Sequence, residues 1–495
     1  MSETLALLGA GFTVALTPLN LALASVGALL GTIVGALPGI GPLNAVALLL
    51  PLVYAVRLPP ESALIVLAAV YYGGGYGGRI AAILLNVPGD PSSVMTTLDG
   101  HPMAKRGEGG VALSITAIGS FVGGIGATAL MILAAPAIAR AALAFGPADY
   151  VALMAFAFAL LAGIGGARPA KTLAAVSCGL LLSTIGADSG TGIERYTFGE
   201  LELLDGIDFT VVVIGLFAVA EVLALIEERA HGGAFVTQVL GRSWPRREEI
   251  ARTLPTMLRS AVVGFIVGVL PGTGASIAAT LAWTLERRLV DREGCFGKGD
   301  IRGVAAPETA DNAAQTGAMV PMLALGIPGS GTTAVLLGAL MLYNITPGPL
   351  LFAQRPEIVW GLIASFVVGN LVLLALNLPL VALFVRLLAL PPSVLYPGVI
   401  VFAFAGVWAV NNSVLDLLLA SLFGVLGWAG RKAGLPLVAV LLGLVLGRLI
   451  EDNIRRALAL SGGEVSALFG GPVAIALWCG AALLLVLPAL RRRFG

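Results

Sequence analysis

Long stretches of this sequence contain no charged residue and no histidine. No Asp, Glu, Lys, Arg or His occurs from Thr4 to Val56, from Val111 to Ala139, or from Asn312 to Gln354. About 20 apolar residues suffice to cross the hydrocarbon core of a bilayer as a helix, and each stretch is longer than that. The longest must cross, turn back and cross again. These stretches predict a protein folded within a lipid bilayer rather than around a large soluble core.

The overall composition agrees with this prediction. Only 12% of the 495 residues are charged and 58% are hydrophobic, whereas a soluble domain carries about 25% charged residues. The net charge of +1 gives no reason to expect a nucleic-acid partner. We predict an all-α polytopic membrane protein with about 12 to 14 membrane segments, the first near residues 5–33.

Two proline–glycine motifs occur twice, in the same order. Gly35-Ala-Leu-Pro-Gly-Ile-Gly41 resembles Gly268-Val-Leu-Pro-Gly-Thr-Gly274, at an offset of 233 residues (from 35 to 268). Val87-Pro-Gly-Asp90 resembles Ile327-Pro-Gly-Ser330, at an offset of 240 (from 89 to 329). We therefore predict two membrane repeats, 1–226 and 257–495, with broken helices or re-entrant hairpins, and expect the repeats to be inverted.

A polar, arginine-rich segment separates the two predicted repeats. Residues 227–256 are expected to form a linker, and its surroundings contain Arg229, Arg242, Arg246, Arg247, Arg252 and Arg259. Basic residues accumulate in cytoplasmic loops of membrane proteins. The linker is therefore predicted to lie in the cytoplasm.

The paired interruptions predict a binding site. Pro-Gly within an apolar segment breaks a helix, which hydrocarbon tolerates only where the broken ends face protein or a watery cavity. Helix N-termini attract anions, and hydroxyl side chains add donors without a buried charge. Such breaks at corresponding positions of two halves are typical of transporter sites, although glycines also serve simply for close helix packing. The predicted substrate-binding residues are Pro38, Gly39, Gly41, Asn44, Asn86, Pro88, Gly89, Thr96, Thr97, Gly272, Gly274, Ser276, Pro328, Gly329, Ser330, Thr332 and Thr333.

An oxygen-rich helical face precedes the third uncharged stretch. Glu308, Asp311, Asn312 and Gln315 are spaced by three and four residues, so a helix would place them on one face. These side chains are predicted to coordinate a sodium ion or relay a proton. The alternative is the solvated start of a helix, in which the acids stabilise the N-terminus. No other cofactor or metal is expected.

Arg79 is the one basic residue deep in an apolar context. Its planar fork could meet a substrate carboxylate. It could equally snorkel, or pair with Asp90, Asp99 or Glu108.

Several functional classes lack their signatures. No Walker A sequence and no His-Glu-x-x-His sequence occurs, which argues against a P-loop ATPase and a zinc protease. Gly297-Lys-Gly-Asp300 matches the Gly-x-Gly-Asp signature of intramembrane aspartyl proteases, but it lies in a hydrophilic loop. We expect a transporter and not an enzyme. An anion channel is the main alternative, although the glycine-rich run Gly73–Gly78 lacks the fourfold repetition of a filter.

The motifs as a set resemble the large membrane subunit of the tripartite tricarboxylate transporters. The resemblance covers most of the chain and includes Leu37-Pro-Gly-Ile-Gly41 and Ile83-Leu-Leu-Asn-Val-Pro-Gly89. Its most specific blocks are Gly303-Val-Ala-Ala-Pro-Glu308 and Leu325-Gly-Ile-Pro-Gly329, followed by Leu336-Leu-Gly-Ala-Leu340. It implies a secondary transporter in a bacterial inner membrane that imports small di- or tricarboxylates such as citrate on a sodium or proton gradient. It also implies two partners, a periplasmic solute-binding protein and a small four-helix membrane subunit. A single-component carboxylate symporter remains the alternative, and the resemblance leaves a homodimer open.

This sequence departs from the family pattern at two positions. Asp311 stands where an asparagine is usual, and Arg79 stands where a small residue is common. Both changes fall near the predicted site, so they leave the substrate and the coupling ion open. A further expectation concerns the loop from Ile193 to Asp208, which carries five acidic residues against the single Arg195 and so suits a basic patch on the binding protein. The alternative is a solvated loop that stays outside because it lacks positive charge.

Overall fold

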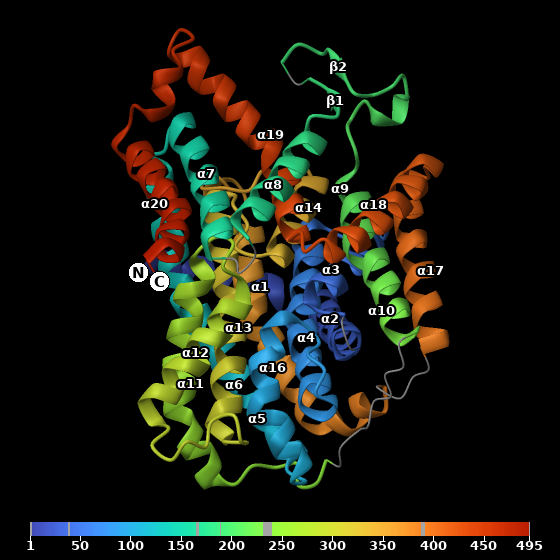
Figure 1. Ribbon diagram of the computed structural model, residues 1–495, viewed down its shortest axis with the longest axis vertical. Coiled ribbons are helices and arrows are strands. Elements are labelled where there is room, and N and C mark those ends of the chain that lie inside the picture. Colours follow the sequence, from blue (N-terminus) through green and yellow to red (C-terminus); the bar gives the residue numbers. More distant parts are fainter. Residues whose placement is uncertain are drawn as a thin grey trace.

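The computed structural model describes residues 2–37, 40–164, 168–188, 190–230, 240–387 and 392–494. Within these ranges the chain forms a bundle of helices with one small β-hairpin at its upper end (Figure 1). The hairpin strands β1 (Gly186–Ala187) and β2 (Glu194–Arg195) are antiparallel. The predicted all-α class is confirmed.

Six helical segments in the described residues are long and apolar enough to cross a bilayer. They are α2 (Pro18–Ala36), α6 (Gly109–Ala142), the continuous run of α9 (Phe209–Val213), the π-helical turn η3 (Ile214–Val219) and α10 (Ala220–Ala230), α11 (Arg247–Val269), α16 (Pro356–Leu387) and α18 (Val414–Lys432). Together with shorter apolar helices, they confirm a polytopic membrane protein.

The remaining helices are shorter, more polar or interrupted. They are α1 (Ser2–Ala15), α3 (Pro42–Ala55), α4 (Pro60–Leu85), α5 (Val94–Lys105), α7 (Pro147–Ile164), α8 (Pro169–Ser183), α12 (Gly274–Val290), α13 (Ile301–Leu325), α14 (Gly331–Leu342), α15 (Leu351–Gln354), α17 (Pro392–Asn411), α19 (Leu437–Leu460) and α20 (Pro472–Phe494), with 3₁₀ turns η1 (Pro91–Ser93), η2 (Leu201–Leu203) and η4 (Val465–Phe469).

The first apolar run does not form the single segment expected near 5–33. It divides between α1 and α2, because Pro18 cannot continue a helix but suits the first turn of a new one. The Thr17 side chain caps α2 by accepting a hydrogen bond from the backbone N–H of Asn20.

The first pair of proline–glycine motifs interrupts helices at matching points. Leu37 ends α2 with φ −72° and ψ 127°, and Leu270 ends α11 with φ −78° and ψ 121°. Gly41 caps α3, whereas Gly272, two residues before α12, and Gly274, its first residue, have φ of +78° and +66°. A positive φ favours glycine, so the break between α11 and α12 depends on these two residues.

The second pair of motifs shows still closer correspondence. α4 ends at Asn86 with φ 59°, and α13 ends at Gly326 with φ 72°, both left-handed caps. The chain then re-enters a helix through Asp90 (φ −149°, ψ 170°) in one motif and Ser330 (φ −152°, ψ 171°) in the other. Each of these residues forms a reciprocal capping box with the residue three positions later. The two breaks therefore share one backbone design at the offset of 240 residues.

Helices that follow corresponding motifs run to opposite ends of the bundle. α3 and α14 reach the upper part in Figure 1, where Tyr54 and Tyr343 stack edge to face at 5.5 Å. α5 and α12 lead to the lower part, where Arg106 donates to the carbonyls of Lys298 and Gly299, each at 2.8 Å. Each end is thus built from one helix of each half of the chain.

Glycines bring helix backbones into direct contact at matching points of the two halves. A Cβ on Gly35 of α2 would lie 2.2 Å from the carbonyl oxygen of Gly74 on α4. A Cβ on Gly268 of α11 would lie 2.4 Å from the carbonyl oxygen of Ala314 on α13. Neither distance leaves room for a side chain, so α2 is held against α4 and α11 against α13.

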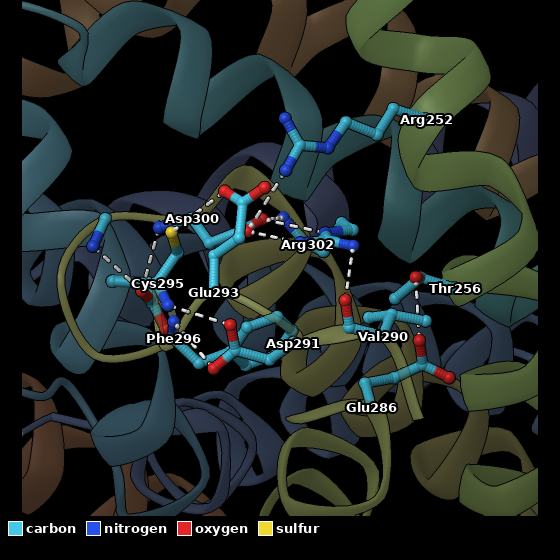
Figure 2. Close-up of polar contacts among 12 residues, drawn as sticks. Arg252, Thr256, Glu286, Val290, Asp291, Glu293, Cys295, Phe296, Asp300 and Arg302 are labelled. Carbon is cyan, nitrogen blue, oxygen red and sulfur yellow. Dashed lines mark hydrogen bonds and ion pairs between the residues drawn. The ribbon is translucent and has the colours of Figure 1, made fainter. Parts of the chain in front are cut away.

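The loop between α12 and α13 is held by its own carboxylates (Figure 2). Asp291 accepts the backbone N–H of Cys295 at 2.7 Å. Asp300 caps α13 by accepting the backbone N–H of Arg302 at 2.8 Å, and it also pairs with the side chains of Arg302 and Arg252. These contacts fix the start of α13, the helix that carries all four predicted ion-coupling residues.

Candidate functional site

α4 and α13 lie side by side and antiparallel in the centre of the bundle. Arg79 of α4 meets Glu308 of α13, and further along Tyr72 meets Thr316, with 2.6 Å between the two hydroxyl oxygens. Because the two helices run in opposite directions, the polar face of α13 lies along the glycine-rich face of α4. Oxygen-bearing side chains are thereby enclosed by protein.

Arg79 and Glu308 form a buried ion pair between the two halves of the chain. Arg79 Nε lies 3.0 Å from Glu308 Oε2, and the side chains are 2% and 3% exposed. The other carboxylate oxygen, Oε1, accepts a hydrogen bond from Thr96 at the start of α5. The structure therefore gives Arg79 a partner other than Asp90, Asp99 or Glu108, the three that its sequence context suggested.

The rest of the Arg79 guanidinium is only partly satisfied. Nη1 donates to the Thr116 carbonyl at 2.7 Å and to Ser120 Oγ at 2.6 Å, both on α6. The guanidinium carbon lies 4.0 Å from the centroid of the Tyr76 ring. Nη2 has no hydrogen-bond partner among the described residues. One arm of the fork thus remains available for an acceptor.

Asp311, Asn312 and Gln315 form a second buried polar group on α13. Their exposed fractions are 3%, 0% and 1%, which rules out the solvated start of a helix. Gln315 Nε2 donates to Asp311 Oδ2 at 3.0 Å. Asp311 Oδ1, Asn312 Oδ1 and Gln315 Oε1 are buried without a hydrogen-bond partner in the described part of the chain. Unpartnered buried oxygens are costly unless a ligand satisfies them.

Glycine on α4 makes the space for this group. A Cβ on Gly75 would lie 2.4 Å from Gln315 Nε2. The next glycine on the same face, Gly78, packs against Gly89 and Asp90 of the interruption that follows α4. The run Gly73–Gly78 therefore serves close helix packing beside a polar group.

The interruption between α13 and α14 also contacts α4. The Tyr71 hydroxyl of α4 lies 3.5 Å from Ser330 Oγ, the residue that caps α14. The Gly272 N–H donates to the Gly329 carbonyl at 3.0 Å, so the two kinds of break also meet each other. Thr332 and Thr333 are buried in the first turn of α14. Pro328 and Gly329 are buried next to them.

Other predicted site residues lie further from this cluster or serve local structure. Asn86 is exposed as a helix cap, and Thr97 donates to the Val94 carbonyl of its own helix. Asn44 donates to Glu221 at 3.3 Å, and Glu221 in turn pairs with Arg431. Ser276, in the first turn of α12, is partly exposed. Pro38 and Gly39 lie outside the described residues.

Three tyrosines on α4 escaped the sequence analysis. Tyr71, Tyr72 and Tyr76 direct their hydroxyls to Ser330, Thr316 and the Ala117 carbonyl. The available signal was a Tyr71-Tyr72 pair just before the glycine run and Tyr76, four and five residues later, within it. Amphipathic rings that carry a polar hydroxyl are suited to line a protein interior with one hydrogen-bonding end.

Comparison with known proteins identifies the family. The sequence pattern of the "Tripartite tricarboxylate transporter TctA family" matches residues 21–442, which is most of the chain. The chain belongs to the tripartite tricarboxylate transporter family. The match spans both pairs of interruptions and all of the buried polar side chains of α4 and α13.

Two relatives of this family member come from Agrobacterium vitis. An "Uncharacterized 52.8 kDa protein in TAR-I ttuC' 3'region" is 39% identical over 496 residues, covering 100% of this chain and 98% of that protein. An "Uncharacterized protein in TAR-II ttuC' 3'region" is 38% identical over 233 residues, covering 46% of this chain and 96% of that protein. No solved structure matches the chain.

As a member of this family, the protein is a multi-pass membrane protein of a tripartite transport system. A tripartite system comprises, in general, a periplasmic binding protein and a small membrane subunit besides the large one.

Proposed function

We propose that this protein is the permease subunit of a binding-protein-dependent system that imports small di- or tricarboxylates across a bacterial inner membrane. A sodium or proton gradient drives the import. The observation that carries the proposal is the buried polar cluster of α4 and α13, placed between two interrupted helices. An enclosed polar site at broken helices is the arrangement that secondary transporters use for substrate and ion.

The two halves are proposed to be inverted repeats. Matching breaks at Asn86 and Gly326 share their cap geometry, while the helices after them, α5 and α14, lead to opposite ends of the bundle. The arginine-rich segment around Arg242 and Arg252 lies at the lower end in Figure 1. Under the positive-inside rule, this end faces the cytoplasm and the β1–β2 end faces the periplasm.

Asp311, Asn312 and Gln315 are proposed to bind the coupling cation. Their three unpartnered oxygens include one carboxylate, which suits a hard monovalent cation such as sodium. No group of three or more His, Cys, Asp or Glu side chains able to hold a metal ion occurs in the described chain. In the sodium-driven case, carboxylate and amide oxygens of these three residues hold the ion.

The substrate carboxylates are proposed to bind at the two interruptions that follow α4 and α13. The N-terminal turn of α14 offers backbone N–H groups and the hydroxyls of Ser330 and Thr332. A small acid with two charges needs several donors to replace its lost hydration. Hydroxyls and helix N-termini provide these donors and still allow release.

The loop from Ile193 to Asp208 is proposed to dock the periplasmic binding protein. Glu200, Glu202 and Asp205 are exposed there, whereas the only arginine, Arg195, is occupied by Glu451 and Asp188. Between the acidic residues, Phe198 and Leu201 are 88% and 80% exposed. Exposed aromatic and aliphatic side chains with an acidic rim suit a partner patch that is apolar at its centre and basic at its edge.

Reconstitution tests the proposal. Proteoliposomes containing this chain and the small membrane subunit are incubated with radiolabelled citrate-like acids in the external buffer. Uptake is measured with and without the binding protein, under imposed sodium or proton gradients. Uptake is expected only with a cation gradient, and it should rise with the amount of binding protein. A Phe198→Asp variant is expected to need far more binding protein, while an exposed control change such as Glu464→Gln leaves the requirement unchanged.

The other two candidate functions give different results. Full-rate, high-affinity uptake by this chain alone would establish a single-component symporter. Flux that does not saturate with substrate and shows no counter-flow would establish an anion channel.

A further inference from the structure

The Arg79–Glu308 ion pair is buried but incompletely paired. Both side chains are almost fully enclosed, and they come from α4 and α13, on opposite sides of the central helix contact. Burying two charges costs several kcal/mol each unless the geometry is nearly ideal. Here it is incomplete, because Nη2 has no hydrogen-bond partner among the described residues, and the 3.0 Å contact between Nε and Glu308 Oε2 is an ion pair without hydrogen-bond alignment.

The incomplete geometry has a specific cause. A carboxylate usually meets arginine with both oxygens against two parallel N–H groups. Glu308 uses only Oε2 for Arg79, since its other oxygen is bound by the Thr96 hydroxyl. Thr96 belongs to α5, the helix that follows the interruption after α4, so a hydrogen bond connects this part of the chain to Glu308.

We propose that Arg79 is a receptor for one carboxylate of the substrate and that Glu308 is its resting counter-ion. A substrate carboxylate occupies the Nη2 and Nε edge of Arg79, and Glu308 is displaced and takes up one proton from water on the side of entry. On the other side the substrate leaves, Glu308 loses its proton and the ion pair re-forms. This inference rests on the proposed transport function and adds a proton to its cycle.

The uptake of a proton follows from the charges around Glu308. Arg79 is the cation that faces it, and Asp90 and Asp311 are the carboxylates within its electrostatic range. Tyr76 contributes only a neutral ring, and α5 and α6 contribute hydroxyls and carbonyls. A displaced, ionised Glu308 would be an unpaired charge beside two other acids. Protonation removes that cost, because a neutral carboxyl needs only hydrogen bonds.

Two substitutions separate this exchange from a purely structural ion pair. Glu308→Gln mimics the protonated form at nearly the same size, and Arg79→Gln with Glu308→Gln removes both charges together. Loss of one partner alone leaves a buried charge, whereas replacement of both avoids that penalty. The double variant therefore keeps the fold testable, and its melting temperature in detergent is measured alongside transport.

The experiment uses the full reconstituted system with a constant sodium concentration on both sides. Wild-type protein should accumulate substrate when the outside is made acidic. Glu308→Gln should lose this proton-driven accumulation entirely, yet keep substrate counter-flow. The double variant should also lose it, and its half-saturation concentration should rise roughly ten- to a hundredfold, the usual effect of a lost hydrogen bond between charged groups.

The outcomes distinguish this inference from the proposed function. If Glu308→Gln still accumulates substrate on a pH gradient, or if the double variant keeps its affinity, the exchange at Arg79 is refuted while sodium-driven transport stands. If wild-type protein transports no carboxylate under any gradient, the proposed function itself fails. A folded double variant that transports like wild type would assign the ion pair to structure alone.

Discussion

The Asp99 carboxylate of α5 accepts a hydrogen bond from the backbone N–H of Asp300, with 2.9 Å between Oδ1 and N. The same oxygen accepts the N–H groups of Gly297 and Gly299, and Oδ2 accepts the Trp283 indole N–H at 3.0 Å. Asp99 is completely buried. One side chain from the first half of the sequence thus holds the loop that starts α13 in the second half.

We expect Asp99→Asn to destabilise the protein by several kcal/mol, because an amide accepts these backbone hydrogen bonds more weakly and adds an unpaired donor. Thermal unfolding in detergent measures the effect. Glu200→Gln, an equivalent loss of charge on an exposed loop, is the control and should leave the melting temperature unchanged. Equal melting temperatures for both variants would mean that Asp99 does not hold the loop.

Gly75→Ala should disturb the Asp311 group without touching it directly. The added methyl would lie 2.4 Å from Gln315 Nε2 and would displace that amide from Asp311. We expect the sodium concentration for half-maximal uptake to rise at least several-fold. Gly369→Ala on α16, where nothing lies within 4 Å of the new methyl, is the matched control. Unchanged sodium dependence in Gly75→Ala would separate Gln315 from the ion site.

Asp311→Asn should alter ion coupling while the protein still folds, because asparagine is nearly isosteric. Loss of the only carboxylate among the proposed cation ligands should weaken sodium binding roughly ten- to a hundredfold, which corresponds to about 1.5–3 kcal/mol. Uptake measured over a sodium series checks this expectation. Full transport with the original sodium dependence would show that Asp311 does not bind the ion.

Ser330→Ala should weaken substrate binding beyond its effect on helix capping. Loss of the cap alone costs about 1 kcal/mol of stability. Ser413→Ala removes a comparable cap from α18, where Ser413 Oγ accepts the Asp416 N–H at 3.1 Å. Both variants should melt at similar temperatures, and only Ser330→Ala should raise the half-saturation concentration for substrate. Identical transport in the two would restrict Ser330 to capping.

The loop at β1–β2 should resist mild acid. Hydrogen bonds from Arg455, and then from the Thr191 N–H, hold the pKa of Asp188 below its ordinary value. A lowered pKa means that the loop is stabilised above the unfolded value of about 3.9 and loses that stabilisation only as the pH falls below it. Hydrogen exchange of residues 190–192 should remain slow at pH 5. Asp188→Asn should accelerate it at neutral pH, and equal exchange in the two proteins would contradict this role.

The interruptions were accessible from sequence because proline and glycine act locally. Pro-Gly followed by a hydroxyl or carboxylate residue predicts a break and a new helix without knowledge of the fold. The capping boxes at Asp90 and Ser330 confirm that local chemistry. The division of α1 from α2 was missed, although Thr17-Pro18 carries the same kind of signal.

The partners across the site were not accessible. Helical spacing predicts that Glu308, Asp311 and Gln315 share one face of a helix. The structure shows them on α13 with different partners. Glu308 pairs with Arg79, whereas Asp311 pairs with Gln315. Which residue of α4 meets Glu308 depends on how two antiparallel helices align. That alignment depends on packing between the two halves, such as the contact of Gly75 with the Gln315 side chain, and periodicity within one segment does not contain it.

The backbone contacts of Gly35 with Gly74 and of Gly268 with Ala314 have a mechanical consequence. Helices separated by side chains can slide, because rotamers rearrange between them. Helices whose backbones touch have no such layer, so α2 with α4, and α11 with α13, are expected to form two rigid helix pairs. Bending of the chain is then expected at the non-helical residues that end each pair. We therefore expect any movement between these helix pairs to pivot at the residues that end their helices, Leu37, Asn86, Leu270 and Gly326, and not to slide one helix along its partner.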